Sequence, residues 1–263
     1  MKLRFVQVDA FAGRPFTGNP AAVMPLEEWL PDPVLQSIAE ENNLSETAFT
    51  IPAEDGEADY ELRWFSPTVE IAFCGHATLA SGHVLLGDKE RLRFRTRKAG
   101  ILAVERDGEG YALDVPQTLV KPGEHEPLLR ALGSPEAELF LSWQGAEATA
   151  ILLLGSEADV RALAPDMKAL GLIDLMVIAT APGEGDDDVV SRVFVPAWGV
   201  DEDPVTGSAH AALTPFWCDR LGRESFSAFQ ASRRGGRVQC RRAGDRAVLG
   251  GRCVTVIEGV MSL

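Results

Sequence analysis

The sequence contains one ordered pattern twice, and this repeat constrains the fold more than any other feature. In each copy the residues R-x-F-x-P are followed by a glutamate and, five residues after it, by a glycine that opens the segment G-x-A-x-x-A. The first copy begins at Arg63 and reaches Gly75; the second begins at Arg192 and reaches Gly207. The arginines are 129 residues apart and the glycines 132, about half of the 263-residue chain. A repeat of this length predicts two similar halves.

Each glycine is expected to begin a buried helix directly after strand-like sequence. The segments that start at Gly75 and Gly207 are rich in small and apolar residues, as a helix enclosed on all sides would be. The first N–H groups of a helix have no partner within it and lie at the positive end of its dipole. We therefore expect the two helix starts to face one cleft and to bind a carboxylate or another anion there.

The charge of the chain excludes several kinds of partner. Asp and Glu number 39 against 25 Lys and Arg, a formal net charge of −14, which opposes binding to nucleic acid or to an anionic membrane surface. Residues 1–9 alternate like a strand and lack the apolar core of a signal peptide, and the apolar runs are too short to span a membrane. These features predict a soluble, cytoplasmic protein.

The cysteines predict neither a metal site nor disulfides. Cys74, Cys218, Cys240 and Cys253 are separated by 144, 22 and 13 residues, which matches no zinc motif and no dense disulfide framework. We expect reduced thiols and no bound metal.

Helix-like and strand-like segments alternate in both halves, which predicts an α+β protein with two domains. Helices are expected over 34–41, 75–86, 157–163 and 207–221. Strands are expected over 1–8, 21–24, 47–51, 60–65, 91–95, 101–105, 111–115, 140–143, 151–154, 175–179, 189–196, near 238 and over 254–258, with a loop over 12–20. Prolines at 116 and 122 interrupt the pattern, so we place the domains at 1–117 and 118–263.

Glu46 is a candidate acid/base group. It lies among small polar residues at the start of an apolar strand, where partial burial of a carboxylate can raise its pKa and suit it to proton transfer. A glutamate exposed at a strand edge is the alternative.

Further candidates lie beside the two helix starts. His76 follows the first glycine, where it could bind a ligand, move a proton or simply pack. Cys74 precedes that glycine, and a helix N-terminus could lower its pKa and make it reactive. Ahead of the second glycine three carboxylates are crowded together; Asp203 suits a turn before Pro204, and Thr206 or Ser208 could cap the helix.

Five segments carry a resemblance to a known family. They are VDAF (8–11), GNPAAV (18–23), NLSETAF (43–49), CGHATLA (74–80) and EDPVTGSA (202–209). In this order they resemble the PhzF-like phenazine-biosynthesis isomerase family, and the resemblance extends over nearly the whole chain. It implies the diaminopimelate epimerase-like fold: two pseudo-symmetric α+β domains, each a set of strands around a central helix, with the active site between them. The last C-terminal residues would then complete the first domain.

The resemblance also implies an activity, namely a cofactor-independent isomerase that moves a proton at carbon of a small, carboxylate-bearing substrate. Carried over by position, Glu46 is the acid/base, and His76, Asp203 and Ser208 position the substrate or assist the proton. The backbone around Gly75, Ala77, Gly207 and Ala209 would hold the substrate carboxylate. A homodimer is expected; the substrate itself is left open.

One departure separates this chain from related racemases that use two cysteines, one before each helix-opening glycine. Cys74 occupies the first of these places, but Thr206 occupies the second. A two-thiol racemase is therefore not expected, which favours Cys74 as a packed residue. Two alternatives remain open: a one-base epimerase or dehydratase of an amino acid or hydroxy acid, and a catalytically silent binding module.

Overall fold

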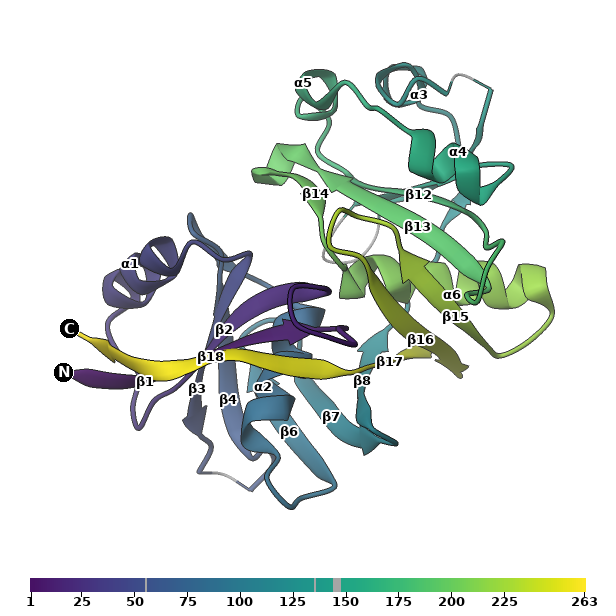
Figure 1. The fold of residues 1–263 in the computed structure, drawn as a ribbon. Helices are drawn as coiled ribbons and strands as arrows, with labels where there is room; N and C mark the ends of the chain where they lie inside the picture. The colour runs from purple at the N-terminus through teal and green to yellow at the C-terminus, as the bar shows by residue number, and fades with distance from the viewer. Residues whose placement is uncertain (55, 135, 144–147) are drawn as a thin grey trace. The chain divides into compact units, whose positions relative to one another are not determined.

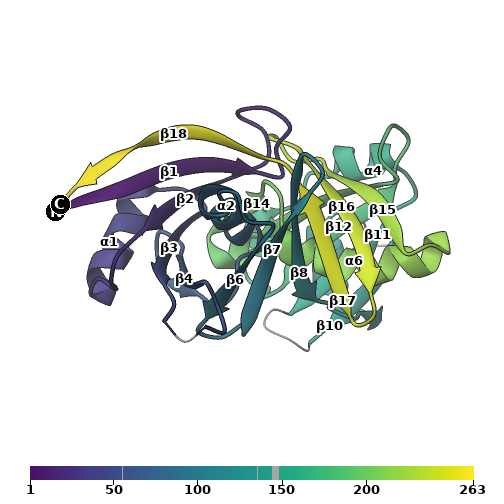
Figure 2. The same cartoon turned by 90° about the horizontal axis from the view of Figure 1, so that it is seen from below.

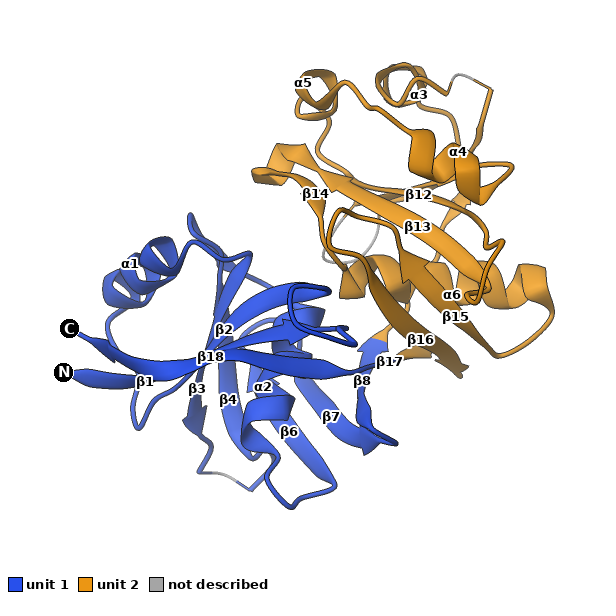
Figure 3. Ribbon diagram, viewed as in Figure 1, with its two compact units in different colours: residues 1–115, 250–263 blue, residues 116–249 orange. Residues whose placement is uncertain are grey.

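The computed structural model describes all residues except 55, 135 and 144–147 (Figure 1). The chain divides into two compact units (Figure 3). Unit 1 comprises Met1–Val115 and Gly250–Leu263, and unit 2 comprises Pro116–Leu249. The expected boundary lay after residue 117, and the chain divides after Val115. The C-terminal segment belongs to unit 1.

Unit 1 consists of strands arranged around one buried helix, α2 (Gly75–Leu85). A second helix, α1 (Asp32–Asn42), covers an apolar cluster at the outside of the strands. The strands of unit 1 are β1 (Lys2–Ala10), β2 (Asn19–Pro25), β3 (Glu46–Pro52), β4 (Tyr60–Phe65), β5 (Glu70–Ile71), β6 (Arg91–Thr96), β7 (Ile101–Asp107), β8 (Gly110–Pro116) and β18 (Cys253–Ser262). The first eight residues of α2 are all buried, as the small-residue sequence predicts for a helix enclosed on every side.

The two ends of the chain lie side by side. Strand β18 pairs with β1 in antiparallel register from Ala10↔Cys253 to Lys2↔Ser262 (Figure 2). The Leu263 N–H donates to the Met1 carbonyl oxygen across 2.8 Å. The C-terminal strand therefore completes the sheet that the N-terminal strand begins.

Unit 2 is built around a second buried helix, α6 (Gly207–Leu221), which ends at Gly222 in the left-handed conformation. Its strands are β9 (Lys121–Pro122), β10 (Glu138–Ser142), β11 (Thr149–Leu153), β12 (Met176–Pro182), β13 (Val189–Val195), β14 (Val200–Asp203), β15 (Ser225–Gln230), β16 (Gly236–Ala243) and β17 (Arg246–Gly251), whose last two residues belong to unit 1. Its short helices are α3 (Glu126–Ala131), α4 (Glu157–Ala162), α5 (Met167–Leu170) and the 3₁₀ turn η1 (Pro196–Trp198). Among the described residues, no helix is long and apolar enough to cross a membrane.

The two units repeat the same order of strand pairing. In unit 1, β2 is parallel to β3, β3 is antiparallel to β4, and β4 is parallel to β6. In unit 2, β11 is parallel to β12, β12 is antiparallel to β13, and β13 is parallel to β15. The central helix follows β5 in one unit and β14 in the other. The repeat found in the sequence is therefore a structural repeat, and the α+β fold of two similar domains is confirmed.

The repeated arginine and glutamate form the same ion pair in both units. Arg63 binds Glu70 through two contacts of 2.7 and 2.8 Å, and Arg192 binds Glu202 through contacts of 2.8 and 3.1 Å. Each guanidinium also lies over the repeated phenylalanine, 5.0 Å from the Phe65 ring and 4.9 Å from the Phe194 ring. Two parallel N–H···O bonds fix both orientation and distance, so this pair ties each strand to the segment that leads into the central helix.

Some elements differ from the sequence-based expectation. The expected loop over 12–20 ends earlier, because Asn19 and Pro20 already belong to β2 and pair with Ala10 and Asp9. Pro20 is accepted there because it is near the start of the strand, where a missing N–H costs little. Strands β15 and β17 were not expected, because half of β15 is polar and β17 ends in Gly250 and Gly251, which indicate a break between strands.

A second pair of equivalent residues supports the start of each central helix. Thr78 Oγ1 donates to the Cys74 carbonyl oxygen across 2.5 Å, and His210 Nδ1 lies 2.7 Å from the Thr206 carbonyl oxygen. The His210 side chain is fully buried, and burial lowers its pKa to about 4, which the contact with Thr206 only partly opposes. The ring therefore stays neutral in the folded protein.

Because His210 is buried as a neutral ring, we expect acid to lower the unfolding free energy of the protein. The substitution His210→Thr should make this loss smaller. Below the ordinary histidine pKa of 6.5 the unfolded chain takes up a proton that folded His210 does not accept until about pH 4, so stability is lost as pH falls through this range. Threonine keeps the helix contact, as Thr78 does, but does not titrate. Between about pH 7.5 and about pH 4.5 the variant should lose ~2 kcal/mol less unfolding free energy than the wild type. Urea unfolding at the two pH values measures this difference; equal losses would contradict it.

Candidate active site

The first turn of α2 brings the candidate residues of unit 1 together. Cys74 has extended backbone angles and ends the preceding segment, and the helix begins at Gly75. His76 and Ala77 follow within the buried first turn. In the described structure no side chain caps this helix. The first N–H groups of α2 therefore lack the side-chain acceptor that commonly binds such groups at a helix start.

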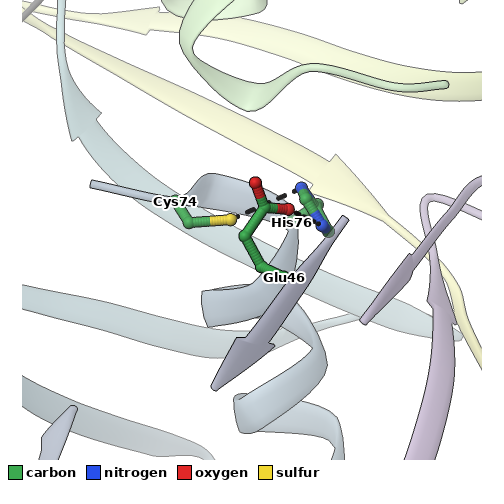
Figure 4. A group of neighbouring side chains, drawn as sticks. All are labelled: Glu46, Cys74 and His76. Atoms are coloured by element: carbon green, nitrogen blue, oxygen red, sulfur yellow. Dashed lines mark hydrogen bonds and ion pairs between the residues drawn. The ribbon is translucent and has the colours of Figure 1, made fainter. Parts of the chain in front are cut away.

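Glu46 and His76 form a buried pair. Glu46 is the first residue of β3, and its Oε2 atom lies 2.9 Å from His76 Nε2 (Figure 4). The His76 side chain is 6% exposed and the Glu46 side chain 18%. Within the described part of the chain neither of the two atoms has a partner that meets hydrogen-bond geometry, so the contact is an ion pair not fully aligned as a hydrogen bond. The alternative of an exposed strand-edge glutamate does not fit this position.

The Cys74 thiol contacts the other ring nitrogen of His76. Its Sγ atom is 3.5 Å from His76 Nδ1, and Figure 4 shows the side chains of Cys74 and Glu46 both turned toward the ring. Burial raises the pKa of Cys74 to about 11, and the neighbouring His76 only partly counteracts this. The expectation that the helix N-terminus would lower this pKa was wrong, because the loss of water around the sulfur outweighs the dipole.

Two opposing effects act on His76. Burial lowers its pKa, but negative charge on Cys74 and Glu46 more than offsets burial and raises the pKa well above its usual value. The imidazole is thus held beside a carboxylate in surroundings of low polarity, where small changes in geometry move protons.

Asn19 completes the surroundings of the imidazole and was not among the predicted site residues. Its Nδ2 atom lies 3.2 Å from His76 Nδ1, and its Oδ1 accepts a hydrogen bond from Ser45 Oγ across 3.1 Å. Asn19 is fully buried. Asn19 lies in the GNPAAV segment, one of the five that carry the family resemblance. The residues of this segment by themselves indicate a turn and do not point to a role in the site.

The same cluster could be considered as a metal site. Glu46, Cys74 and His76 each offer one ligand atom within 4.8 Å of the others. Metal binding by cysteine requires the thiolate, whose formation burial opposes here, and both imidazole nitrogens already contact protein groups. We therefore interpret the cluster as an acid/base group.

The protonated, buried thiol predicts that Cys74→Ala leaves most of the activity intact. The variant removes a group that carries no charge at neutral pH, so we expect turnover to stay within about tenfold of the wild type. Cys240→Ala, which removes another buried thiol in unit 2, is the matched control for packing loss. A collapse of turnover in a folded Cys74→Ala protein would revive a thiol mechanism.

In unit 2 the candidate Asp203 is bound to the residues that lead into α6. Thr206 Oγ1 donates to Asp203 Oδ2, and Gln230 Nε2 donates to the Asp203 carbonyl oxygen across 2.8 Å. Gln230 Oε1 accepts from the Thr206 N–H across 2.9 Å. In the described structure neither Thr206 nor Ser208 caps the helix with its side chain, contrary to the sequence-based expectation, because Thr206 is engaged with Asp203.

Ser208 occupies the position in α6 that His76 occupies in α2, one residue after the glycine. Its Oγ atom lies 3.5 Å from the sulfur of Met176, the first residue of β12. The strand register makes Met176 the counterpart of Glu46: Phe49 pairs with Arg63 as Ala179 pairs with Arg192, and each candidate lies three residues earlier. The contact between Glu46 and His76 is thus replaced in unit 2 by an uncharged contact between Met176 and Ser208.

The four backbone candidates are distributed evenly between the units. Gly75 and Ala77 are buried in the first turn of α2, and Gly207 and Ala209 are buried in the first turn of α6. The predicted residues therefore form two groups, one with Glu46 and His76 in unit 1 and one with Asp203 and Ser208 in unit 2.

Comparison with known proteins identifies the family. Residues 8–259 match the family described as "Phenazine biosynthesis-like protein". A relative in Pseudomonas aeruginosa, "Uncharacterized isomerase PA3578", is 48% identical, and the match covers all of both chains. The crystal structure of a PhzF family protein from Enterococcus faecalis is 43% identical with a TM-score of 0.91, again over all of both chains.

A more distant structure shares the fold alone. A hydroxyproline epimerase from Agrobacterium vitis has a TM-score of 0.63 at 15% identity, covering 100% of this chain and 93% of the other. From the family match and the similarity over the full length, the chain belongs to the PhzF-like, phenazine biosynthesis-like family.

Proposed function

We propose that this protein is a cofactor-independent isomerase that moves a proton from one carbon to another in a small substrate bearing a carboxylate. Glu46 is the proton carrier, and His76 assists it. Asp203 and Ser208 position the substrate. The names of the relatives as isomerases are consistent with this activity.

The main support for the proposal is the contact between the buried side chains of Glu46 and His76. A carboxylate and an imidazole with their nearest atoms 2.9 Å apart and largely out of water are costly to maintain for structure alone. Among the residues described, neither atom of this contact meets hydrogen-bond geometry with any partner, although both atoms are buried, and buried polar atoms left in this way are uncommon where they serve structure alone. An imidazole with a raised pKa beside a carboxylate is typical of an acid/base site.

The proposed reaction conserves every atom and electron. The Glu46 carboxylate accepts a proton from an acidic C–H group, and the electron pair of that bond spreads into a conjugated system of the substrate. Glu46 then returns the proton to a different carbon, so that a double bond changes position. The uncapped N–H groups at Gly75 and Gly207 stabilise the carboxylate of the substrate and the charge that develops near it.

The repeat supports a single proton carrier. A two-base reaction would need a second titratable group at the equivalent place in unit 2. That place holds Met176 beside Ser208, and the residue before the glycine is Thr206 rather than cysteine. None of these side chains accepts a proton near neutral pH. A one-base reaction is therefore the form of catalysis that we propose.

Incubation with candidate substrates in heavy water tests this function. Amino acids and cyclohexadiene-type acids would be incubated with the wild type and with Glu46→Gln, and followed by NMR and mass spectrometry. A product that is an isomer of the substrate, with a shifted double bond and with either hydrogen or deuterium at the carbon that receives the proton, supports the proposal. Inversion at one carbon would indicate an epimerase instead, and loss of water a dehydratase. Activity that is equal in Glu46→Gln would contradict the role of Glu46.

A further inference from the structure

The side chain of Gln230 holds the turn that leads into α6. Its Oε1 atom accepts the Thr206 N–H across 2.9 Å, and its Nε2 atom donates to the Asp203 carbonyl oxygen across 2.8 Å. These two backbone groups leave one orientation for the amide, because a backbone N–H only donates and a backbone carbonyl oxygen only accepts. Gln230 is fully buried, whereas Asp203 and Thr206 are half-buried. Gln230 therefore lies behind residues that a small molecule can reach.

The same amide is linked to the side chain of Asp203. The Gln230 Nε2 atom has two hydrogens, and its second acceptor is Thr206 Oγ1, at 3.2 Å. The Thr206 hydroxyl in turn donates its own hydrogen to Asp203 Oδ2. The three side chains thus form a chain of hydrogen bonds that fixes the direction of the Asp203 carboxylate.

Strand pairing in unit 2 brings these residues together. Strand β12 occupies one edge of β13, and β14 and β15 share the other edge. Asp203 ends β14 opposite Val193, and Gln230 ends β15 opposite Ser191. The two strands therefore meet end to end where the chain turns toward α6, and the Gln230 amide spans the interval between them.

Comparison of the two units shows that this chain of side chains is not repeated. Ile71 takes the place of Asp203 in unit 1, because each pairs with the residue after the repeated arginine. Thr96 takes the place of Gln230, because each pairs with the residue before that arginine. The Thr96 hydroxyl donates to the Gly100 carbonyl oxygen within its own hairpin. The residue before the helix-opening glycine is cysteine there instead of threonine, so all three members differ.

We propose that Gln230 is a positioning residue that directs the Asp203 carboxylate and the start of α6 toward the substrate. The ion pair between the repeated arginine and glutamate occurs in both units and so serves the fold. The Gln230 chain occurs where a candidate substrate-binding carboxylate stands, and isoleucine in the other unit needs no such orientation. Gln230 also occupies the Thr206 N–H, so α6 presents the N–H groups that follow it. This inference rests on the proposed function, in which Asp203 and Ser208 position the substrate, and deepens it.

Amide hydrogen exchange of the full-length protein, followed residue by residue by NMR, tests the proposal without any substrate. Gln230→Met keeps the length of the side chain, but its thioether cannot donate and accepts only weakly. The Thr206 amide should therefore exchange at least about tenfold faster in this variant, whereas the amides of β12 and β13 should keep their wild-type rates.

Gln239→Met is the matched control, because Gln239 is exposed on the neighbouring strand β16. It should leave the exchange of the Thr206 amide unchanged. A Thr206 amide that exchanges as slowly in Gln230→Met as in the wild type would overturn the proposal. Equal acceleration of exchange throughout unit 2 would also overturn it, because that result indicates a loss of stability and no local role.

Steady-state kinetics on a substrate identified by the heavy-water screen separate positioning from stability. Loss of folded enzyme lowers the apparent kcat and leaves KM unchanged, whereas a misdirected Asp203 carboxylate weakens substrate binding. Gln230→Met should therefore raise KM by at least about tenfold, with kcat within about threefold of the wild type, because the pair of Glu46 and His76 is left intact. A KM within about twofold of the wild type would contradict the proposal.

A second variant keeps the test valid if Gln230→Met fails to fold. Thr206→Val keeps the shape of the side chain and the backbone N–H that Gln230 binds, but it removes the hydroxyl that links Gln230 to Asp203. The amide at position 206 should then stay protected while KM rises at least about tenfold. A wild-type KM in this variant would contradict the role of the chain. Failure to find any isomerase substrate would count against the proposed function, whereas the exchange of the Thr206 amide would still decide the role of Gln230.

Discussion

Glu46→Gln is expected to lower turnover by about two to four orders of magnitude while substrate binding changes little. The amide has the size of the carboxyl group and can still contact His76 Nε2, but it cannot accept a proton from carbon. The loss should therefore appear in kcat rather than in KM. Steady-state kinetics on a substrate identified by the heavy-water screen measures both values.

Two further variants make this result specific. Glu41→Gln makes the same substitution at an exposed position of α1 and should leave kcat unchanged. Glu46→Asp keeps the carboxyl group but withdraws it by one methylene, so its kcat should lie between those of the wild type and the glutamine variant. If Glu46→Gln retained turnover within a few-fold of the wild type, Glu46 could not be the proton carrier.

The repeat made the central part of the fold predictable. A glycine that follows a strand and opens a run of small residues specifies a buried helix start, and both helices begin at the expected residues, Gly75 and Gly207. Arg63 and Arg192 were found as pattern positions only, because a sequence does not show which charges meet. The structure supplies the reason for their recurrence: each fixes a glutamate that leads into the helix.

The asymmetry of the two halves was only partly predictable. Thr206 could be compared with Cys74 directly, because both precede an aligned glycine. Met176 could not be compared with Glu46 in the same way, because no repeated motif marks the two positions, although they lie 130 residues apart, close to the offset of the repeat. Only the pairing of Ala179 with Arg192 and of Phe49 with Arg63 shows that the two positions are equivalent.

The surroundings of His76 depended on contacts that sequence patterns do not reveal. Asn19 and His76 are separated by 57 positions, and their contact follows from the packing of α2 against β2. The state of Cys74 depended on the same packing. A helix start lowers the pKa of a thiol that remains hydrated, but enclosure by neighbouring elements reverses the direction of the shift.

The conformation of Gly18 explains why this turn can deliver Asn19 to the site. Gly18 has a φ angle of +67°, which side-chain-bearing residues rarely adopt. A Cβ atom there would lie 2.2 Å from the Ala10 carbonyl oxygen and 2.9 Å from the Ala12 Cβ. The residue before Asn19 must therefore be glycine for two separate reasons, the backbone angle and the close approach of β1.

Comparison of Gly18→Ala with Gly100→Ala should separate these two reasons. Gly100 has a φ angle of +70°, but an added Cβ would meet nothing within 4 Å, so its substitution should cost only the backbone strain, about 1–2 kcal/mol. Gly18→Ala adds a collision with backbone that cannot yield without moving β1 or β2, and we expect a total of about 3–5 kcal/mol. Urea unfolding measures both values. Because any relief of the collision displaces Asn19, Gly18→Ala should also lose activity under conditions where it remains folded, whereas Gly100→Ala should not. Equal destabilisation of the two variants would show that the close approach to Ala10 does not constrain this turn.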